Sequence, residues 1–242
     1  MYTYYRSIGL KKALISQTNL YLMSTKTVLN LKQSIKSNLP FIVFVAFLFS
    51  FRSSVADWYH VPTASMEPTI QVGDRVVVDK SAYTLELPFT DIVIAKTGRI
   101  NRGDIVIIDS SAANTRLIKR VIAVEGDEIK LENNVLFING KKAALTAKSQ
   151  YLFSEEILGQ TRTIALNPLP VPVKSFNLVT VPKHHVLALG DNRNNSVDSR
   201  YYGFIPVKEI QGKANAVAFS LDTDNMYLPR KDRFLHQLDR TE

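Results

Sequence analysis

The sequence predicts a mainly β fold: an antiparallel β-rich core with a small inserted second domain, preceded by one N-terminal transmembrane helix. Two observations support this prediction. From residue 72 onward, short apolar and β-branched runs alternate with Gly-Asp and Asn-Gly turns, a spacing typical of antiparallel strands in a barrel or sandwich. Before them, residues 39–51 form the only apolar run of this length without a charge. The 242 residues allow one or two domains.

Basic charge is concentrated at the N-terminus. Residues 1–38 contain six Lys or Arg and no acidic residue, and they account for +6 of the formal net charge of +8. The remaining chain is almost neutral, which argues against nucleic acid as a partner. The absence of Cys excludes disulfides, thiolate metal sites and a cysteine nucleophile. No metal and no other cofactor is expected.

Residues 39–57 are predicted to be a transmembrane anchor. The run LPFIVFVAFLFSF covers about 20 Å as a helix, which is shorter than the ~30 Å hydrocarbon core of a bilayer. Arg52 can extend its charge to the interface, and residues 55–59 can prolong the helix up to the aromatic side chains of Trp58 and Tyr59. The positive-inside rule places residues 1–38 in the cytoplasm and the residues after Trp58 outside.

Three other interpretations of this run remain open. It is a core helix if the flanking charge is accidental. It is a cleaved signal peptide if the small-x-small pattern Ser54-Val55-Ala56 is a cleavage site, although the 38-residue polar leader is long for that. A basic segment without acidic residues is also typical of an organelle presequence.

The strands are predicted from apolar and β-branched runs bounded by turn residues. These runs are residues 75–78, 92–95, 104–108, 117–124, 134–138 and 185–189. No long segment after residue 60 has a helical period.

The domain limits follow from changes in composition. Residues 143–182 are polar, contain four prolines, and are predicted to be the inserted small domain. They divide the core into residues 58–142 and 183–221. The charged residues 222–242 are predicted to be a C-terminal surface segment.

Serine and lysine are the remaining candidates for chemistry. None of the four His residues has neighbours typical of a zinc ligand or a catalytic triad. The segment Gly190-Asp191-Asn192-Arg193 lacks the later glycine and lysine of a phosphate-binding loop.

Ser65 and Lys119 each have two interpretations. Ser65 lies in a loop stiffened by Pro62 and Pro68, which is either an ordinary loop or a rigid turn that exposes a nucleophile. Lys119 lies on an apolar strand, on the same face as Leu117. It either protects a sheet edge or is a buried base, which requires lowering its pKa from ~10.4 to about 7–8.

A third cluster, residues 190–203, follows a predicted strand and is dense in hydrogen-bonding groups. Asp198 and Arg200 are spaced to pair, and Ser196 can contact a nearby amine. A solvated turn is the alternative.

Four motifs that occur in order resemble the type I signal (leader) peptidases, a family of membrane-bound serine proteases with a Ser-Lys dyad. The resemblance runs from about Arg52 to Ile210. The motifs are Ser65-Met66 with Pro68, Gly73-Asp74-Arg75, Lys119-Arg120 before Gly126-Asp127, and Gly190-Asp191-Asn192-Arg193 through Ser196, Asp198, Ser199 and Arg200.

The resemblance implies a role for each matching residue. Ser65 is implied to be the nucleophile and Lys119 the general base. The backbone N–H of Ser65 is implied to form half of an oxyanion hole, and the hydroxyl of Thr63 the other half, at a position where the family has serine or glycine. Ser196 is implied to hold the Lys119 amine.

The same resemblance implies supporting roles in two further places. Asp198 and Arg200 are implied to pair and brace their loop. Met66 and the apolar stretch after it are implied to lie against lipid.

The implied function is removal of N-terminal signal peptides from secretory preproteins after small residues, usually in Ala-x-Ala. An extended substrate is expected to pair with a sheet edge, and membrane localisation is expected to add to affinity. The implied location is the bacterial inner (plasma) membrane, with a single span, a cytoplasmic N-terminus and the catalytic domain on the outer face. The short single span, the small insertion and the absence of Cys depart from many family members.

Three alternatives to this function remain. One is a specialised Ser-Lys processing peptidase, associated with conjugation or with an organelle inner membrane. A second is a non-catalytic, membrane-tethered module that binds exported peptides. The third is a self-cleaving repressor, which would carry an N-terminal DNA-binding domain instead of a membrane span.

Overall fold

The computed structural model describes residues 33–90, 92–169 and 173–238, and the chain divides into two compact units, residues 1–50 and 51–242. Helix α2 (Leu39–Ser54) provides most of what is described of the first unit. No helix within the described ranges combines the length and the hydropathy needed to span a membrane. Several large apolar side chains of α2 are exposed, among them Phe41, Phe44, Phe47 and Phe49.

Helix α2 ends before the predicted anchor does. After Val55 the chain enters strand β1 (Ala56–His60), which pairs with β2 (Asp74–Asp79). Trp58 and Tyr59 therefore lie on a strand, and the prediction that residues 55–59 prolong the helix is wrong. Pairing with β2 decides the outcome, because aromatic residues fit a half-buried strand well and local propensity alone is weak.

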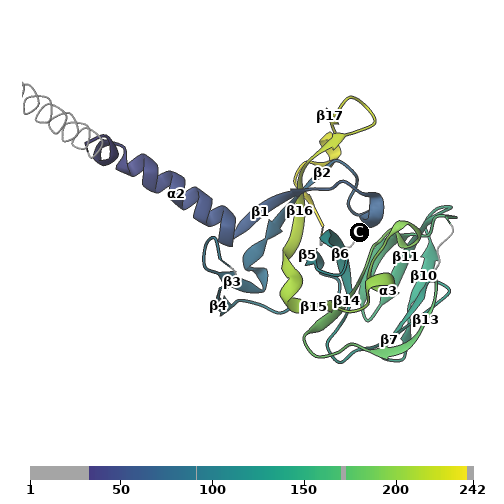
Figure 1. Ribbon diagram of the computed structural model, residues 1–242. Coiled ribbons are helices and arrows are strands. Elements are labelled where there is room, and N and C mark those ends of the chain that lie inside the picture. Colours follow the sequence, from purple (N-terminus) through teal and green to yellow (C-terminus); the bar gives the residue numbers. More distant parts are fainter. Residues whose placement is uncertain (1–32, 91, 170–172, 239–242) are drawn as a thin grey trace, which may run out of the picture. The chain divides into compact units, whose positions relative to one another are not determined.

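A nine-stranded antiparallel sheet forms the centre of the second unit (Figure 1). Its main order is β1-β2-β16-β5-β6-β14-β15, and two short strands, β17 and β18, also pair with β16. This sheet confirms the prediction of a mainly antiparallel β fold. The bounds not yet given are β5 (Ile105–Ser110), β6 (Thr115–Val124), β14 (His185–Leu189), β15 (Ile205–Pro206), β16 (Ile210–Asp222), β17 (Leu228–Pro229) and β18 (His236–Gln237).

Three smaller sheets complete the second unit. The first is the hairpin of β3 (Thr84–Glu86) and β4 (Val93–Lys96). The second has the order β13-β7-β8-β9, built from Phe176–Thr180, Glu128–Glu132, Val135–Ile138 and Lys141–Lys142. The third has the order β10-β11-β12, built from Ala144–Ala147, Leu152–Ile157 and Gln160–Ala165.

The six predicted strands correspond to β2, β4, β5, β6, β8 and β14. After residue 60 the described helices are short: the four-residue α3 (Ser199–Tyr202) and 3-10 turns. The predicted insertion, residues 143–182, contains strands of two sheets: β10, β11 and β12 form a sheet of their own, whereas β13 pairs with β7. That pairing joins the predicted insertion to the predicted core.

The apolar residues around Ser65 form part of the core. Met66 is 1% exposed and Ile70 is fully buried, and both pack with Val76 and Val78 of β2. The expectation that Met66 and the apolar stretch after it face lipid is therefore wrong. Burying these side chains stabilises the second unit by roughly 2 kcal/mol each and fixes the loop between β1 and β2.

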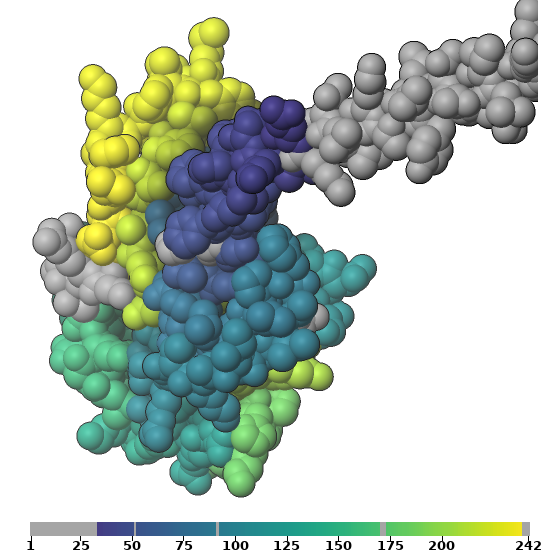
Figure 2. Space-filling model, turned by 90° about the vertical axis from the view of Figure 1, so that its left-hand side faces the viewer, coloured from purple at the N-terminus to yellow at the C-terminus, as the bar shows by residue number. Residues whose placement is uncertain are grey.

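Most described residues of the predicted C-terminal surface segment are exposed, but two of its side chains are buried. Strands β17 and β18 pair with β16, and Figure 2 shows the yellow C-terminal atoms against the yellow-green atoms of β16. Arg233 is buried and forms an ion pair with Asp74 (Nη2–Oδ2 2.5 Å). Leu238 is buried in the same core cluster as Met66. This segment therefore contributes to the second unit's interior.

Candidate active site

Ser65 lies in the loop between β1 and β2, on the 3-10 turn η1 (Ala64–Met66). Both ends of this loop are fixed by main-chain hydrogen bonds, from Val61 N to Asp74 O and from Gly73 N to Val61 O. The buried side chain of Met66 anchors the turn to the core. Ser65 itself is partly exposed, so its hydroxyl is held on a rigid support at the rim of the core.

Lys119 extends from β6 to Ser65. Its Nζ lies 2.8 Å from Ser65 Oγ and donates a second hydrogen bond, of 3.0 Å, to the carbonyl oxygen of Ile118. Only 3% of Lys119 is exposed. Burial lowers the pKa of its amine to about 8, although the charges of Asp198 and Asp191 act in the opposite direction. A substantial fraction of the amine is therefore neutral near physiological pH and able to accept a proton.

The segment after β14 packs against the Ser65 turn. A Cβ on Gly190 would lie 2.4 Å from the carbonyl oxygen of Ser65 and 2.3 Å from Ser196 Oγ, so only glycine permits this approach. Asn192 then donates its backbone N–H to Ser65 O and its side-chain Nδ2 to Ala64 O, each at 3.1 Å. Asn192 therefore fixes the carbonyl oxygens of both Ala64 and Ser65.

The Asp198 carboxylate is the shared hydrogen-bond acceptor for several polar groups of this loop. Its carboxylate accepts hydrogen bonds from Gly190 N (3.0 Å), Ser196 Oγ (2.8 Å) and Arg200 Nε (2.8 Å), and it caps α3. Burial acts to raise the pKa of Asp198, but the hydrogen bonds and charge of Arg200 outweigh it and the pKa is lowered. The expected pairing of Asp198 with Arg200 is present (2.8 Å).

Two expected contacts differ from the observed arrangement. Ser196 donates to Asp198, and the described hydrogen bonds of the Lys119 amine go to Ser65 and Ile118 instead of Ser196. Ser196 nevertheless lies at the site, because its Oγ occupies the space beside Gly190. Thr63 precedes η1, is exposed, and its side chain makes no capping hydrogen bond to that turn.

Sequence reasoning missed two buried ion-pair networks behind the dyad. Arg120, on the opposite face of β6 from Lys119, binds Asp191 through Nη2 (2.7 Å), and Thr69 Oγ1 donates to the same carboxylate (2.6 Å). Asp191 and Arg120 appear in the motifs, but nothing in the local sequence shows that they pair.

The second network joins the three-stranded sheet to the loop after β14. Glu155 of β11 is fully buried and accepts hydrogen bonds from Arg193 (2.8 and 2.6 Å) and from Arg162 of β12 (2.6 Å). Burial opposes ionisation of Glu155, but the two arginines lower its pKa to about 2. The carboxylate is therefore ionised at any physiological pH.

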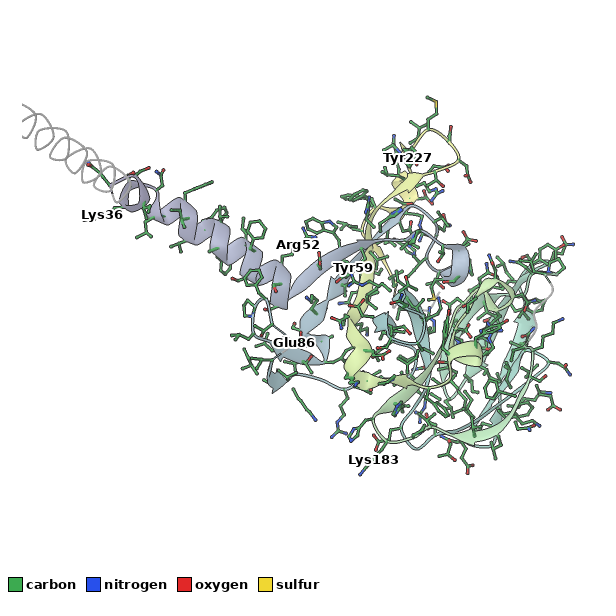
Figure 3. The ribbon with its side chains drawn as sticks, viewed as in Figure 1. Lys36, Arg52, Tyr59, Glu86, Lys183 and Tyr227 are labelled. Atoms are coloured by element: carbon green, nitrogen blue, oxygen red, sulfur yellow. The ribbon has the colours of Figure 1, made fainter. Side chains whose placement is uncertain are left out.

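Two strand edges lie beside the dyad. Among the described strands, β1 pairs with β2 alone, and residues 115–119 of β6 pair with β5 alone. The guanidinium of Arg116 stacks over the ring of Tyr59 at 4.6 Å, which holds β1 and β6 near one another; Figure 3 labels Tyr59. Unpaired N–H and C=O groups on these edges can bind an extended peptide.

The described residues contain no group of three or more His, Cys, Asp or Glu arranged to hold a metal ion. The groups described at the site are a serine hydroxyl, a lysine amine and main-chain hydrogen-bond donors.

Comparisons with known proteins place the chain in a family. The model of the family "Signal peptidase, peptidase S26" matches residues 32–219. Signal peptidase I of Pseudomonas aeruginosa is 32% identical over 206 residues, which cover 76% of this chain and 71% of that protein. Signal peptidase I P of Bacillus subtilis subsp. natto is 31% identical over 182 residues, covering 75% of this chain and 86% of that protein.

A third relative, probable signal peptidase I-2 of Synechocystis, is 31% identical over 169 residues, which span 67% of this chain and 63% of that protein's length. The family model covers well over half of the chain, and its match includes Ser65, Lys119 and the loop after β14. The chain belongs to the signal peptidase family, peptidase S26.

Proposed function

We propose that this signal peptidase is a serine endopeptidase that removes N-terminal signal peptides from exported proteins after small residues in an Ala-x-Ala pattern. Ser65 is the nucleophile and Lys119 the general base. The observation that carries the proposal is the 2.8 Å contact between Lys119 Nζ and Ser65 Oγ, in a site where burial lowers the pKa of the amine to about 8.

The reaction follows from this contact. The neutral amine of Lys119 takes the hydroxyl proton as Ser65 Oγ attacks the carbonyl carbon of the scissile bond. The resulting ammonium protonates the leaving amine, the C–N bond breaks, and an ester with Ser65 remains. Water then attacks the ester, Lys119 takes a proton from it, and Ser65 Oγ leaves with that proton.

The negative oxygen of the tetrahedral intermediate needs hydrogen-bond donors. We assign one to the backbone N–H of Ser65 and the other to the hydroxyl of Thr63, two residues earlier in the same loop. Thr63 is free to turn its hydroxyl toward this oxygen because its side chain does not cap η1. Each such donor contributes a factor of about 10²–10³ to the rate.

Substrate binding is assigned to the edges of β1 and β6. An extended peptide that pairs with these edges gains main-chain hydrogen bonds irrespective of its side chains. This suits a substrate class in which small residues at the cleavage site supply little contact area.

The test is cleavage of a fluorogenic Ala-x-Ala signal peptide in detergent by the wild type and the variants Ser65→Ala and Lys119→Ala. Both variants are expected to lose at least about 10³-fold in kcat. Lys183→Ala is the control, because this exposed lysine lies outside the site. A second peptide with a bulky residue in place of the Ala before the scissile bond should resist cleavage.

The same experiment distinguishes the remaining candidate functions. A folded wild type that cleaves no Ala-x-Ala peptide favours a specialised processing peptidase with a dedicated substrate. Binding without cleavage favours a peptide-binding module. Cleavage that survives Ser65→Ala refutes the Ser-Lys assignment.

The lipid bilayer is the proposed partner of the N-terminal helix. Helix α2 exposes large apolar side chains. Arg52, labelled in Figure 3, stacks over the Trp58 ring at 5.1 Å, a pairing suited to a membrane interface. The hairpin β3-β4 also exposes Leu87, Phe89 and Ile94. The six basic residues of 1–38 favour a cytoplasmic N-terminus and a catalytic unit on the outer face of a bacterial inner membrane.

Protease protection tests this topology. In intact spheroplasts, an added protease should digest the unit of residues 51–242 and spare an epitope tag before Met1. The opposite pattern, or recovery of the full chain in the soluble fraction, refutes the membrane proposal without affecting the Ser-Lys assignment.

A further inference from the structure

We propose that Asn192 is a positioning residue for Ser65, and that Asn167 acts on Ser65 through Asn192. The inference rests on the proposed function, in which Ser65 is the nucleophile. According to this inference, strands β10, β11 and β12 and the residues that follow them help to hold the catalytic turn.

Asn192 contacts the nucleophile's turn twice. Its backbone N–H donates to the carbonyl oxygen of Ser65, and its Nδ2 donates to the carbonyl oxygen of Ala64, both at 3.1 Å. Asn192 is 1% exposed, so water does not compete for these bonds. The two acceptors are the carbonyl oxygens of consecutive residues of η1. Holding both oxygens fixes the position and the rotation of the peptide units on either side of Ser65.

The side-chain amide of Asn192 is itself held in one orientation. Its Oδ1 accepts a 3.0 Å hydrogen bond from Asn167 Nδ2, while its Nδ2 donates to Ala64 O. A flipped amide would place a donor against a donor on one side and two oxygens together on the other. Asn167 therefore selects the orientation in which Asn192 reaches the catalytic turn.

Asn167 is attached to a rigid support. It follows β12 by two residues, and the N–H of Ala165 on that strand donates to Asp191 O at 2.9 Å. One residue after Asn192, Arg193 is locked by Glu155 of β11. The loop after β14 is thus fixed to the three-stranded sheet on both sides of Asn192.

This arrangement affects kcat more than KM. The turn can shift once the Asn192 side chain is removed, and a displacement of the nucleophile by about 1 Å costs about 100-fold in rate. The peptide is proposed to bind the edges of β1 and β6, which Asn192 does not contact. We therefore expect Asn192→Ala to lower kcat by about 10–100-fold and to change KM by less than about twofold.

The experiment is a double-mutant cycle with Asn192→Ala, Asn167→Ala and the double variant, assayed on the Ala-x-Ala peptide well below the melting temperature of each protein. Asn167→Ala alone should lower kcat, by a smaller factor. In the Asn192→Ala background it should have no further effect, because its route to Ser65 is already removed. A purely structural role for either residue would lower the melting temperature and leave kcat unchanged.

Asn194→Ala is the matched control. Asn194 lies in the same loop and also makes two side-chain hydrogen bonds, with Asn167 O (2.5 Å) and Asn134 Nδ2 (3.1 Å), but neither reaches the Ser65 turn. It should lose stability as the other variants do and keep kcat within about twofold. Asn192→Asp, which keeps the acceptor for Asn167 but loses the donor to Ala64, should be as impaired as Asn192→Ala.

Three results overturn the inference: full kcat in Asn192→Ala, an equal loss of kcat in Asn194→Ala, or additive effects in the double variant. The wild type and Ser65→Ala separate this failure from failure of the proposed function. If the wild type cleaves and Ser65→Ala does not, full activity of Asn192→Ala refutes the positioning role alone.

Discussion

Lys119 and Ser65 are separated by 54 residues in the chain, and a 2.8 Å hydrogen bond joins their side chains. Ser65 is held by a loop between β1 and β2, whereas Lys119 projects from β6. Neither the loop nor the strand contains the site alone. The order of strands in the central sheet, in which β16 and β5 separate β2 from β6, brings the two together.

The pH dependence of cleavage should follow the lowered pKa of Lys119. The base acts only when neutral, so kcat/KM should rise about tenfold per pH unit below pH 8 and level off above it. The measurement is kcat/KM from pH 6 to 10, with stability checked at each pH. A profile that keeps rising up to pH 10 would contradict the buried environment of this amine.

Asp198→Asn should move that profile toward lower pH. The charge of Asp198 raises the pKa of Lys119, and the charge of Arg200 lowers it. Removing the carboxylate leaves Asp191 as the acidic residue that opposes the arginine's influence, so Lys119 becomes neutral at lower pH while kcat at the plateau falls. Asp224→Asn, which changes an exposed carboxylate, is the control and should leave the profile in place.

Gly190→Ala should strongly lower activity. The added Cβ would meet a backbone oxygen of Ser65 at 2.4 Å, which backbone atoms cannot tolerate without moving the catalytic turn. We expect a loss of about 100-fold or more in kcat. Gly126→Ala is the comparison: its Cβ would meet nothing within 4 Å, but its φ of +83° makes it strained. That variant should lose about 1 kcal/mol of stability and remain active.

The role of Thr63 in the oxyanion hole can be tested with a substitution that removes the hydroxyl and keeps the shape of the side chain. Thr63→Val should lower kcat by about 10²–10³-fold if the hydroxyl donates to the intermediate, whereas Thr63→Ser should retain most activity. Steady-state kinetics of the two variants decide the matter. Equal activity in both would leave the second oxyanion donor to another group.

Glu155→Gln should destabilise the second unit by about 3–5 kcal/mol, because it leaves Arg193 and Arg162 buried without a counter-charge. The pKa of Glu155 is about 2, below the ~4.3 of an unfolded chain. Its contribution is therefore complete above pH 4.3 and is lost as the pH falls toward 2. Urea unfolding at pH 7 and pH 3 should show a smaller gap between wild type and variant at pH 3; an equal gap would contradict this pairing.

The strands that could be predicted are those with uninterrupted apolar runs. Strands β5 and β14, almost entirely buried, were evident from composition. Strands such as β12, with the sequence QTRTIA, were missed because Arg162 and its neighbours read as a polar loop. Burial of that arginine depends on Glu155, seven residues away, and no local pattern reports it.

The site could be predicted only in part, for a similar reason. Ser65 and Lys119 were found through motifs, and the pairing of Asp198 with Arg200 through short spacing. The contact of Thr69 with Asp191 joins residues 122 positions apart, and the contacts of Asn192 with the Ser65 turn span a similar distance. Such contacts are products of the sheet order and have no signal in the sequence of either partner.

The alternation of side chains along β6 limits the changes in chain length that this part of the protein can accept. Lys119 lies opposite Val106 of β5 and Arg120 opposite Ile105, so the two cations face opposite sides of the sheet. A slip of one residue would turn Arg120 toward Ser65, and a guanidinium, which stays protonated at neutral pH, cannot accept a proton there. Insertions in the turn at residues 111–114 preserve this frame, whereas deletion of a single residue between 115 and 118 moves Arg120 into the position of Lys119, beside the nucleophile.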